Sequence, residues 1–132
     1  MITTLHHVAL IVSSEESLRF YELLGFTEIF RNIRTNDVVV LMKGHEIQLE
    51  IFIDSRHPVH TSGMEEPIGL RHFALKVSGD LEDEIEELRA AFSSAGYELE
   101  AGPVMKDWTG VRFCFIKDFD GLSVELRENN RK

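Results

Sequence analysis

Apolar and polar residues are spaced along the chain in a way that predicts two amphipathic helices. Apolar side chains recur every three or four residues over 18–24 and again over 85–95, which is the spacing of one face of an α-helix. A glycine follows each segment, Gly25 after the first and Gly96 after the second. Glycine commonly ends a helix because it adopts a left-handed backbone conformation at little steric cost. We therefore expect one helix in each half of the chain.

Each predicted helix also has a polar residue suited to its first turn. Ser13 and Glu16 have the spacing of a capping box, in which each side chain binds the backbone N–H of the other residue. Asp80 stands directly before Leu81, where an aspartate accepts hydrogen bonds from the free N–H groups at a helix start.

The chain contains an internal repeat. Residues 5–12 match residues 70–77 at five of eight positions, and each segment has the pattern of a strand that precedes a predicted helix. Further strand-like segments follow each helix and end in an alternating strand, at 47–52 in the first half and at 122–127 in the second. A repeated order of elements indicates a duplicated structural unit.

We therefore predict an α+β fold made of two βαβββ modules, residues 4–53 and 70–128, within one domain that spans 1–132. A length of 132 residues suits a single domain. The connector between the modules, residues 54–69, contains two prolines and two glycines, a composition typical of loops.

The last strand of each module separates its side chains onto two faces, because successive residues of a strand point in opposite directions. In 47–52 the alternate apolar residues form a face that a helix would cover, and Glu50 points the other way. In 122–127 the same alternation places Glu125 on the uncovered face.

Two histidines recur in step with these glutamates. His7 lies in the first strand of one module and His72 at the matching place in the other, each on the uncovered face. A single histidine in a strand is usually a structural residue. Its recurrence with a glutamate favours a functional role, because a carboxylate without a partner is costly to bury. Two imidazoles and two carboxylates suit one divalent ion such as nickel, zinc, cobalt, manganese or iron.

The composition excludes several classes of protein. Hydrophobic residues make up 43% and charged residues 28%, as in ordinary soluble domains. The net charge of −9 argues against a nucleic acid partner, because phosphate binding needs a basic surface. The single cysteine, Cys114, cannot form an intrachain disulfide, and we interpret it as a small packing residue on the side of the cavity.

No segment predicts a membrane partner. The longest apolar runs, 8–12 and 38–42, have five residues each, far fewer than the about 20 that a membrane-spanning helix needs. The N-terminal residues lack the basic and apolar regions of a secretory signal. We expect a cytoplasmic protein.

The chain resembles the vicinal oxygen chelate superfamily, which includes glyoxalase I, single-domain dioxygenases, epimerases and drug-resistance proteins. Four segments carry the resemblance: His-Val-Ala-Leu at 7–10, the stretch 20–26 with its Leu-Gly-Phe ending, Gly-Leu-Arg-His at 69–72 and Asp-Phe-Asp-Gly-Leu at 118–122. The pattern is most similar to the lactoylglutathione-lyase-like subgroup. The resemblance implies a cupped mixed sheet around a metal site, with the helices on the outer face.

The same resemblance implies the roles of the site residues. The metal ligands would be His7, Glu50, His72 and Glu125, and either glutamate would be the catalytic base. The uncovered faces and their surroundings offer further side chains for substrate binding, namely Gln48, Phe52, Lys76, Arg112 and Arg127.

The implied activity is that of a lyase or isomerase, which binds two adjacent substrate oxygens and moves a proton next to a carbonyl. Two alternatives stay open. A non-haem iron dioxygenase uses two histidines and one carboxylate, which would leave Glu50 without a role as a ligand. A drug-binding resistance protein without catalysis would usually lack the metal residues. We expect a small-molecule substrate and a homodimer, in which the modules pair within one chain or across the dimer.

Two positions depart from glutathione-dependent glyoxalase I. Ile11 stands where that enzyme has an arginine, and Asp54 stands where it has an asparagine. An apolar side chain and an anion cannot replace a cation and a neutral donor in binding carboxylates. We therefore expect glutathione-linked methylglyoxal to be a poor substrate.

Overall fold

The computed structural model describes residues 1–58 and 68–128. The chain divides into two compact units, Met1–Val59 and His60–Lys132. The boundary falls inside the predicted connector, and each unit contains one of the predicted modules.

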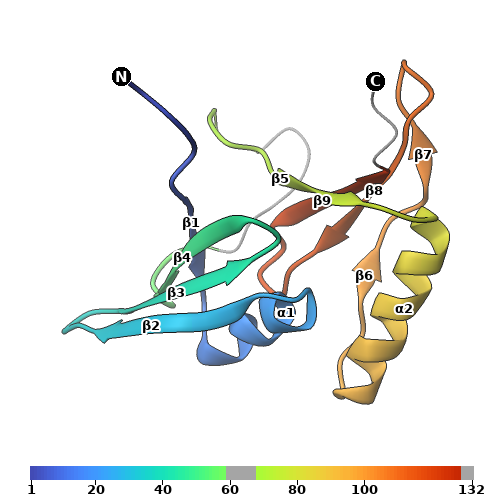
Figure 1. Ribbon diagram of the computed structural model, residues 1–132. Helices are drawn as coiled ribbons and strands as arrows, with labels where there is room; N and C mark the ends of the chain where they lie inside the picture. The colour runs from blue at the N-terminus through green and yellow to red at the C-terminus, as the bar shows by residue number, and fades with distance from the viewer. Residues whose placement is uncertain (59–67, 129–132) are drawn as a thin grey trace. The chain divides into compact units, whose positions relative to one another are not determined.

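Unit 1 has the predicted order of elements, with one short 3₁₀ turn before its helix (Figure 1). The elements of unit 1 are β1 (Val8–Val12), η1 (Glu15–Ser17), α1 (Leu18–Leu23), β2 (Thr27–Ile33), β3 (Val38–Gly44) and β4 (Ile47–Ile53). The strands form one mixed sheet in the order β1-β4-β3-β2. The first strand, β1, runs parallel to the last, β4, and the other neighbours are antiparallel.

Unit 2 repeats this plan with one interruption. Its elements are β5 (Phe73–Val77), α2 (Leu81–Ser94), β6 (Glu100–Ala101), β7 (Met105–Lys106), β8 (Arg112–Lys117) and β9 (Ser123–Glu128). The sheet order is β5-β9-β8-β6, and β7 also pairs with β8. The strand expected after the helix is split into β6 and β7 around Pro103, which has no N–H to donate to a ladder. The α+β class and both βαβββ modules are confirmed, with one mixed sheet in each unit.

The predicted division of side chains between two faces is also confirmed. In β4, Leu49 and Ile51 are fully buried, while Glu50 between them is half-buried. In β9, Val124 and Leu126 belong to the core of unit 2. The helix of each unit contributes to the core of its own unit, and Phe20 and Tyr21 of α1 and Phe92 of α2 are all fully buried.

The start of the first helix differs from the prediction. The 3₁₀ turn η1, with Ser14 as its N-cap, precedes α1, and the N-cap of α1 itself is Ser17 rather than Ser13. The end is as expected, since Gly25 follows with φ of 107°. A side chain at Gly25 would also collide with the imidazole of His45, whose Nε2 donates to the carbonyl of Leu24 at 2.6 Å.

Asp80 caps the second helix as predicted. Its Oδ1 accepts a hydrogen bond from the backbone N–H of Asp83 at 3.0 Å. The first turn of α2 is acidic, which suits the partial positive charge of a helix N-terminus.

A tight turn leads into β9. The N–H of Gly121 donates to the carbonyl of Asp118 at 3.1 Å. The Asp118 carboxylate accepts from the backbone N–H groups of Asp120 and Leu122 at 2.9 and 2.8 Å. Gly121 has φ of 88°, a conformation that side chains with a branched Cβ rarely adopt. The turn therefore sets where β9, and with it Glu125, begins.

Cys114 lies on the opposite face from the predicted one. It pairs with Leu126 in the β8–β9 register and is fully buried. The interpretation as a packing residue is confirmed, while its placement toward a cavity was wrong because it shares the core face with Ile116. Burial raises the pKa of the Cys114 thiol to about 11.

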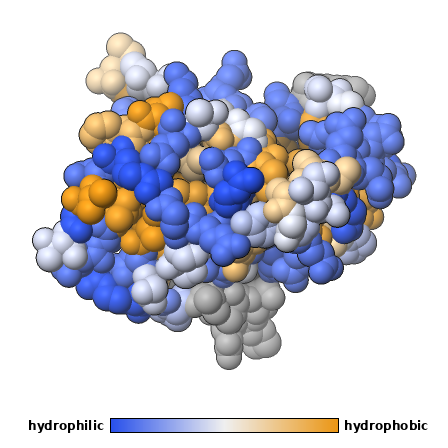
Figure 2. All heavy atoms as spheres, turned by 90° about the horizontal axis from the view of Figure 1, so that it is seen from below, coloured by the Kyte–Doolittle hydropathy of each residue, from blue (hydrophilic) through white to orange (hydrophobic). Residues whose placement is uncertain are grey.

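The surface is mixed in character. Figure 2 shows hydrophilic residues over most of the face drawn there, with apolar areas between them, as on ordinary protein surfaces. In the two described stretches of the chain, no helix combines the length and the apolar character needed to cross a membrane.

We predict that Gly121→Val destabilises unit 2, because the positive φ at Gly121 forces a branched side chain into a strained conformation. The expected loss is about 1–3 kcal/mol in the free energy of unfolding, measured by urea denaturation. Gly79→Val is the matched control, because Gly79 lacks a positive φ and an added Cβ there meets no atom within 4 Å. Equal stability of the two variants would contradict this role for the turn.

Candidate metal centre

The first His–Glu pair lies on the open face of unit 1. His7 comes directly before β1, and Glu50 is in β4, opposite Ala9 in the parallel register. The Nε2 atom of His7 lies 3.7 Å from Oε1 of Glu50, and both side chains are about one-third exposed, at 35% and 31%. The Nδ1 atoms of His6 and His7 lie 2.8 Å apart, so one imidazole donates to the other and leaves the Nε2 atom of His7 directed at Glu50.

The second pair repeats this arrangement in unit 2. His72 comes directly before β5, and Glu125 is in β9, opposite Ala74. The Nε2 atom of His72 lies 3.0 Å from Oε1 of Glu125. This pair is less accessible, with 27% of the His72 side chain and 8% of the Glu125 side chain exposed. The ring of Phe115 packs edge-on against His72 at 4.9 Å between centroids.

Arg127 holds the second oxygen of Glu125. Its Nη1 donates to Oε2 of Glu125 at 2.5 Å, and its Nη2 donates to the carboxylate of Asp107. The guanidinium also lies over the Phe113 ring, 5.5 Å from its centroid. The bond to Glu125 is the main cause that raises the pKa of Arg127. Glu125 is therefore a charge-paired carboxylate with a fixed orientation.

Asp107 completes this network from the loop between β7 and β8. Its Oδ1 accepts hydrogen bonds from the backbone N–H groups of Thr109 and Val111 and from the Thr109 hydroxyl, at 2.7, 3.1 and 2.6 Å. The pKa of Asp107 lies well below its usual range. The hydrogen bonds from Thr109 are the main cause, and those from Arg127 and Val111 add to the effect. Asp107 was not predicted as a site residue from the sequence. The Asp-Trp-Thr-Gly segment signals a turn, but only the fold brings that turn to Arg127.

Arg112 does not lie on the face predicted for it. It is on the core side of β8, in step with Cys114, and its guanidinium binds Glu128 at 2.7 Å and Glu82 of α2 at 2.6 Å. A third carboxylate, Asp80, lies 3.1 Å away. The hydrogen bond to Glu128 is the main cause that raises the pKa of Arg112, and the bond to Glu82 adds to it. Arg112 therefore joins the helix to the sheet and lies away from the face predicted to bind the substrate.

The other predicted substrate residues lie on the expected faces. Gln48 and Phe52 alternate with the buried residues of β4, and Lys76 is exposed on β5 opposite Arg127. Phe52 and Glu50 line a hollow of about 230 Å³, whose rim includes Arg34. The Arg34 guanidinium lies over the Phe52 ring, 5.6 Å from its centroid, a contact that the sequence pattern did not signal.

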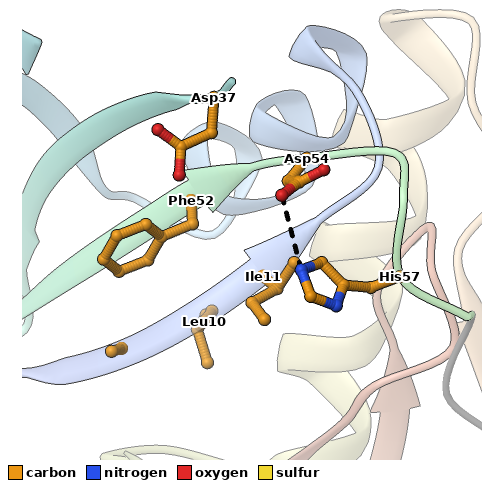
Figure 3. A pocket seen from close by; sticks show the side chains of 7 residues that line it. Leu10, Ile11, Asp37, Phe52, Asp54 and His57 are labelled. Carbon is orange, nitrogen blue, oxygen red and sulfur yellow. Dashed lines mark ion pairs between the residues drawn. The ribbon is translucent and has the colours of Figure 1, made fainter. Parts of the chain in front are cut away.

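A second hollow of unit 1, of about 330 Å³, is lined by Leu10, Ile11, Asp37, Phe52, Asp54 and His57 together with Ala9 (Figure 3). Asp54 is almost completely buried, and its carboxylate accepts two side-chain hydrogen bonds from Arg56 at 2.8 and 2.6 Å. The bond from Arg56 is the main cause that lowers the pKa of Asp54. His57 lies 3.4 Å from the same carboxylate.

The chemistry of the two His–Glu pairs fits a divalent ion. Each unit supplies one imidazole nitrogen and one carboxylate oxygen on an open sheet face, the donor types that zinc, nickel and related ions accept. Within residues 1–58 and 68–128, no three metal-ligating side chains gather at one point, so each unit by itself supplies two ligands and not a complete set.

We predict that Arg127→Met destabilises the protein by about 2–3 kcal/mol, because the nearly buried Glu125 carboxylate loses a charge-assisted hydrogen bond. Arg19→Met is the matched control. Its ion pair with Glu22 is well exposed, with 44% and 43% of the side chains accessible, and should cost less than about 0.5 kcal/mol. Urea denaturation measures the free energy of unfolding of both variants. Equal losses would show that the hydrogen bond from Arg127 to Glu125 stabilises the protein no more than an exposed ion pair does.

Known proteins resemble this chain along almost its whole length. A curated protein of Escherichia coli (strain K12), the uncharacterized protein YaeR, is 33% identical over 128 residues, which is 93% of this chain and 94% of that protein. The crystal structure of a glyoxalase family protein from Enterococcus faecalis has a TM-score of 0.78 at 36% identity, covering 95% of this chain and 97% of the other.

More distant structures share the fold. Lactoylglutathione lyase from Agrobacterium tumefaciens has a TM-score of 0.64 at 18% identity, with 97% of this chain and 95% of that chain covered. Residues 4–126 match the Glyoxalase/Bleomycin resistance protein/Dioxygenase superfamily. The repeated βαβββ modules and this match lead to one conclusion: the chain belongs to the glyoxalase, bleomycin resistance protein and dioxygenase superfamily.

Proposed function

We propose that the protein is a metal-dependent lyase or isomerase that moves a proton on a carbon next to a carbonyl of a small molecule, and that it acts as a homodimer. The observation that carries this proposal is the recurrence of one His–Glu pair in each unit, at the same place in the same parallel strand pairing. A structural role does not require both the histidine and the glutamate to recur on a face that the helices leave open.

The four residues that would hold the ion are His7, Glu50, His72 and Glu125. A bound divalent ion would polarise a carbonyl and stabilise the negative charge that develops on two adjacent oxygens. The protein side chains would orient the substrate and carry the proton.

The two glutamates differ in a way that divides these tasks. Glu125 is held through one oxygen by Arg127 and through the other by His72, and 8% of its side chain is exposed. Glu50 is 31% exposed, and its nearest imidazole nitrogen is 3.7 Å away, beyond hydrogen-bond distance. Glu50 is thus freer to rotate, and a base must reach the proton that it removes.

In the proposed reaction, Glu50 takes a proton from the carbon beside the carbonyl. The electron pair of the broken C–H bond forms a C=C bond, and the π pair of the carbonyl moves onto its oxygen. The protonated Glu50 then returns the proton to the former carbonyl carbon, while the hydroxyl proton of the first carbon passes to the other oxygen, so that the carbonyl and the hydroxyl exchange places. Arg127 keeps the Glu125 carboxylate in place during these steps, because its guanidinium stays charged at any physiological pH.

The two alternative functions have less support from the site. A dioxygenase site uses one carboxylate with two histidines, whereas a glutamate accompanies the histidine in both units here. A binding protein without catalysis does not need the two His–Glu pairs, and both pairs are present here.

We predict that the protein binds about one Ni²⁺ or Zn²⁺ ion per pair of modules. His72→Ala should weaken that binding at least about a hundredfold, because one direct ligand is lost. His57→Ala is the matched control, since His57 lies outside both pairs. Isothermal titration calorimetry of metal-free protein decides the question, and unchanged binding in the His72→Ala variant would overturn the proposed ligand set.

We also predict that Glu50→Gln slows proton removal by about 10²–10⁴-fold, the usual contribution of a general base. The measurement is deuterium exchange at the CH₂ group of hydroxyacetone in D₂O, followed by NMR with Ni²⁺-loaded protein. Glu46→Gln, an exposed change just before β4, should leave the rate unchanged. If instead Glu125→Gln stops the exchange while the metal stays bound, and Glu50→Gln leaves the exchange rate unchanged, then Glu125 and not Glu50 is the base.

A further inference from the structure

The larger of the two hollows described above continues the face that carries Glu50. In the parallel pairing of β1 with β4, Ala9 is opposite Glu50 and Ile11 is opposite Phe52. Asp54 extends the ladder, since its N–H donates to the carbonyl of Val12 at 2.9 Å. Two residues along a strand span about 7 Å, so Phe52 lies one such step along β4 from Glu50, and Ile11 lies two steps along the chain from His7.

The floor of this hollow is apolar. Ile11, on the edge strand β1, is 50% exposed, and the Phe52 ring flanks the same space (Figure 3). The volume of about 330 Å³ falls in the lower part of the range of about 300–1,000 Å³ that small-molecule pockets occupy.

The charged groups at the rim are already paired. The Arg34 guanidinium donates two hydrogen bonds to Asp37, both of 2.6 Å, and is the main cause that lowers the pKa of Asp37. Asp54 is bound in the same way by Arg56. Among the described residues that line the hollow there is no lysine or arginine. A carboxylate placed there would meet an apolar floor and two aspartates whose charges Arg34 and Arg56 already compensate.

We infer that this hollow, the Ile11 pocket, receives an uncharged aryl or branched alkyl group of the substrate, attached next to the two oxygens that bind at the His–Glu pairs. The inference rests on the proposed function, because those oxygens define where the substrate's reacting end lies. It narrows the substrate class to small neutral molecules in which an apolar substituent adjoins a vicinal pair of oxygens.

The test compares two hydroxamates on the Zn²⁺-loaded full chain. Acetohydroxamate and benzohydroxamate present the same pair of adjacent oxygens and differ in a methyl or a phenyl group. Burying the extra apolar surface of the phenyl group should make benzohydroxamate bind about ten- to fiftyfold more tightly, as measured by calorimetry. Ile11→Arg should reduce this preference to about threefold or less, because a charged side chain then occupies the apolar floor.

Two variants serve as controls. Ile29→Arg places the same charge on an isoleucine of equal exposure, 51%, that does not line the pocket, and it should keep the preference. Ile11→Val should keep most of the preference for benzohydroxamate, because the side chain stays apolar. NMR gives an independent readout, since the ring protons of benzohydroxamate should show contacts to the Ile11 δ1 methyl group and none to that of Ile29.

The outcomes separate the two ideas. If neither hydroxamate binds the Zn²⁺-loaded protein, the metal centre of the proposed function is wrong and this inference fails with it. If both bind equally, or if Ile11→Arg leaves the preference unchanged, the metal centre stands and the assignment of the Ile11 pocket is wrong.

Discussion

The parallel pairing of the first and last strands of each unit is the constraint on which the rest of the site depends. In both units an alanine of the first strand is opposite the glutamate of the last strand, Ala9 with Glu50 and Ala74 with Glu125. The histidine stands two residues before that alanine, and a spacing of two keeps side chains on one face of a strand. A slip of one residue in either pairing would move the glutamate into the apolar core.

The two units use this shared frame differently. Unit 2 surrounds its pair with Arg127, Asp107 and Phe115, so that each polar atom of Glu125 has a partner and the carboxylate is almost completely buried. In unit 1 the carboxylate of Glu50 is more exposed and faces a hollow. A rigid carboxylate suits a metal ligand and a mobile one suits a base, so the difference in packing accounts for the division of tasks that we propose.

Charge pairing shapes the apolar character of the Ile11 pocket as much as the apolar residues do. Asp37 and Asp54 would otherwise attract a cation, but each carboxylate is bound through two hydrogen bonds by an arginine nearby in the sequence. With these charges compensated, the apolar floor is what distinguishes the pocket from the surrounding surface. This is consistent with the expectation that Ile11 makes glutathione a poor fit.

The sequence by itself determined the repeated βαβββ order, the helix ends at Gly25 and Gly96, and the face of β4 and β9 on which each glutamate lies. These features depend on local periodicity and on backbone conformation, which neighbouring residues specify. Only the tertiary structure decided the partners of the long charged side chains. Alternation indicated that Cys114 and Arg112 share one face of β8, but it did not decide which face. The pairing of Cys114 with the buried Leu126 and the ion pair of Arg112 with Glu82 of α2 placed both residues on the core side. Asp107 reaches Arg127 across 20 residues of sequence, because pairing between distant strands, and not any local pattern, brings those two charges together.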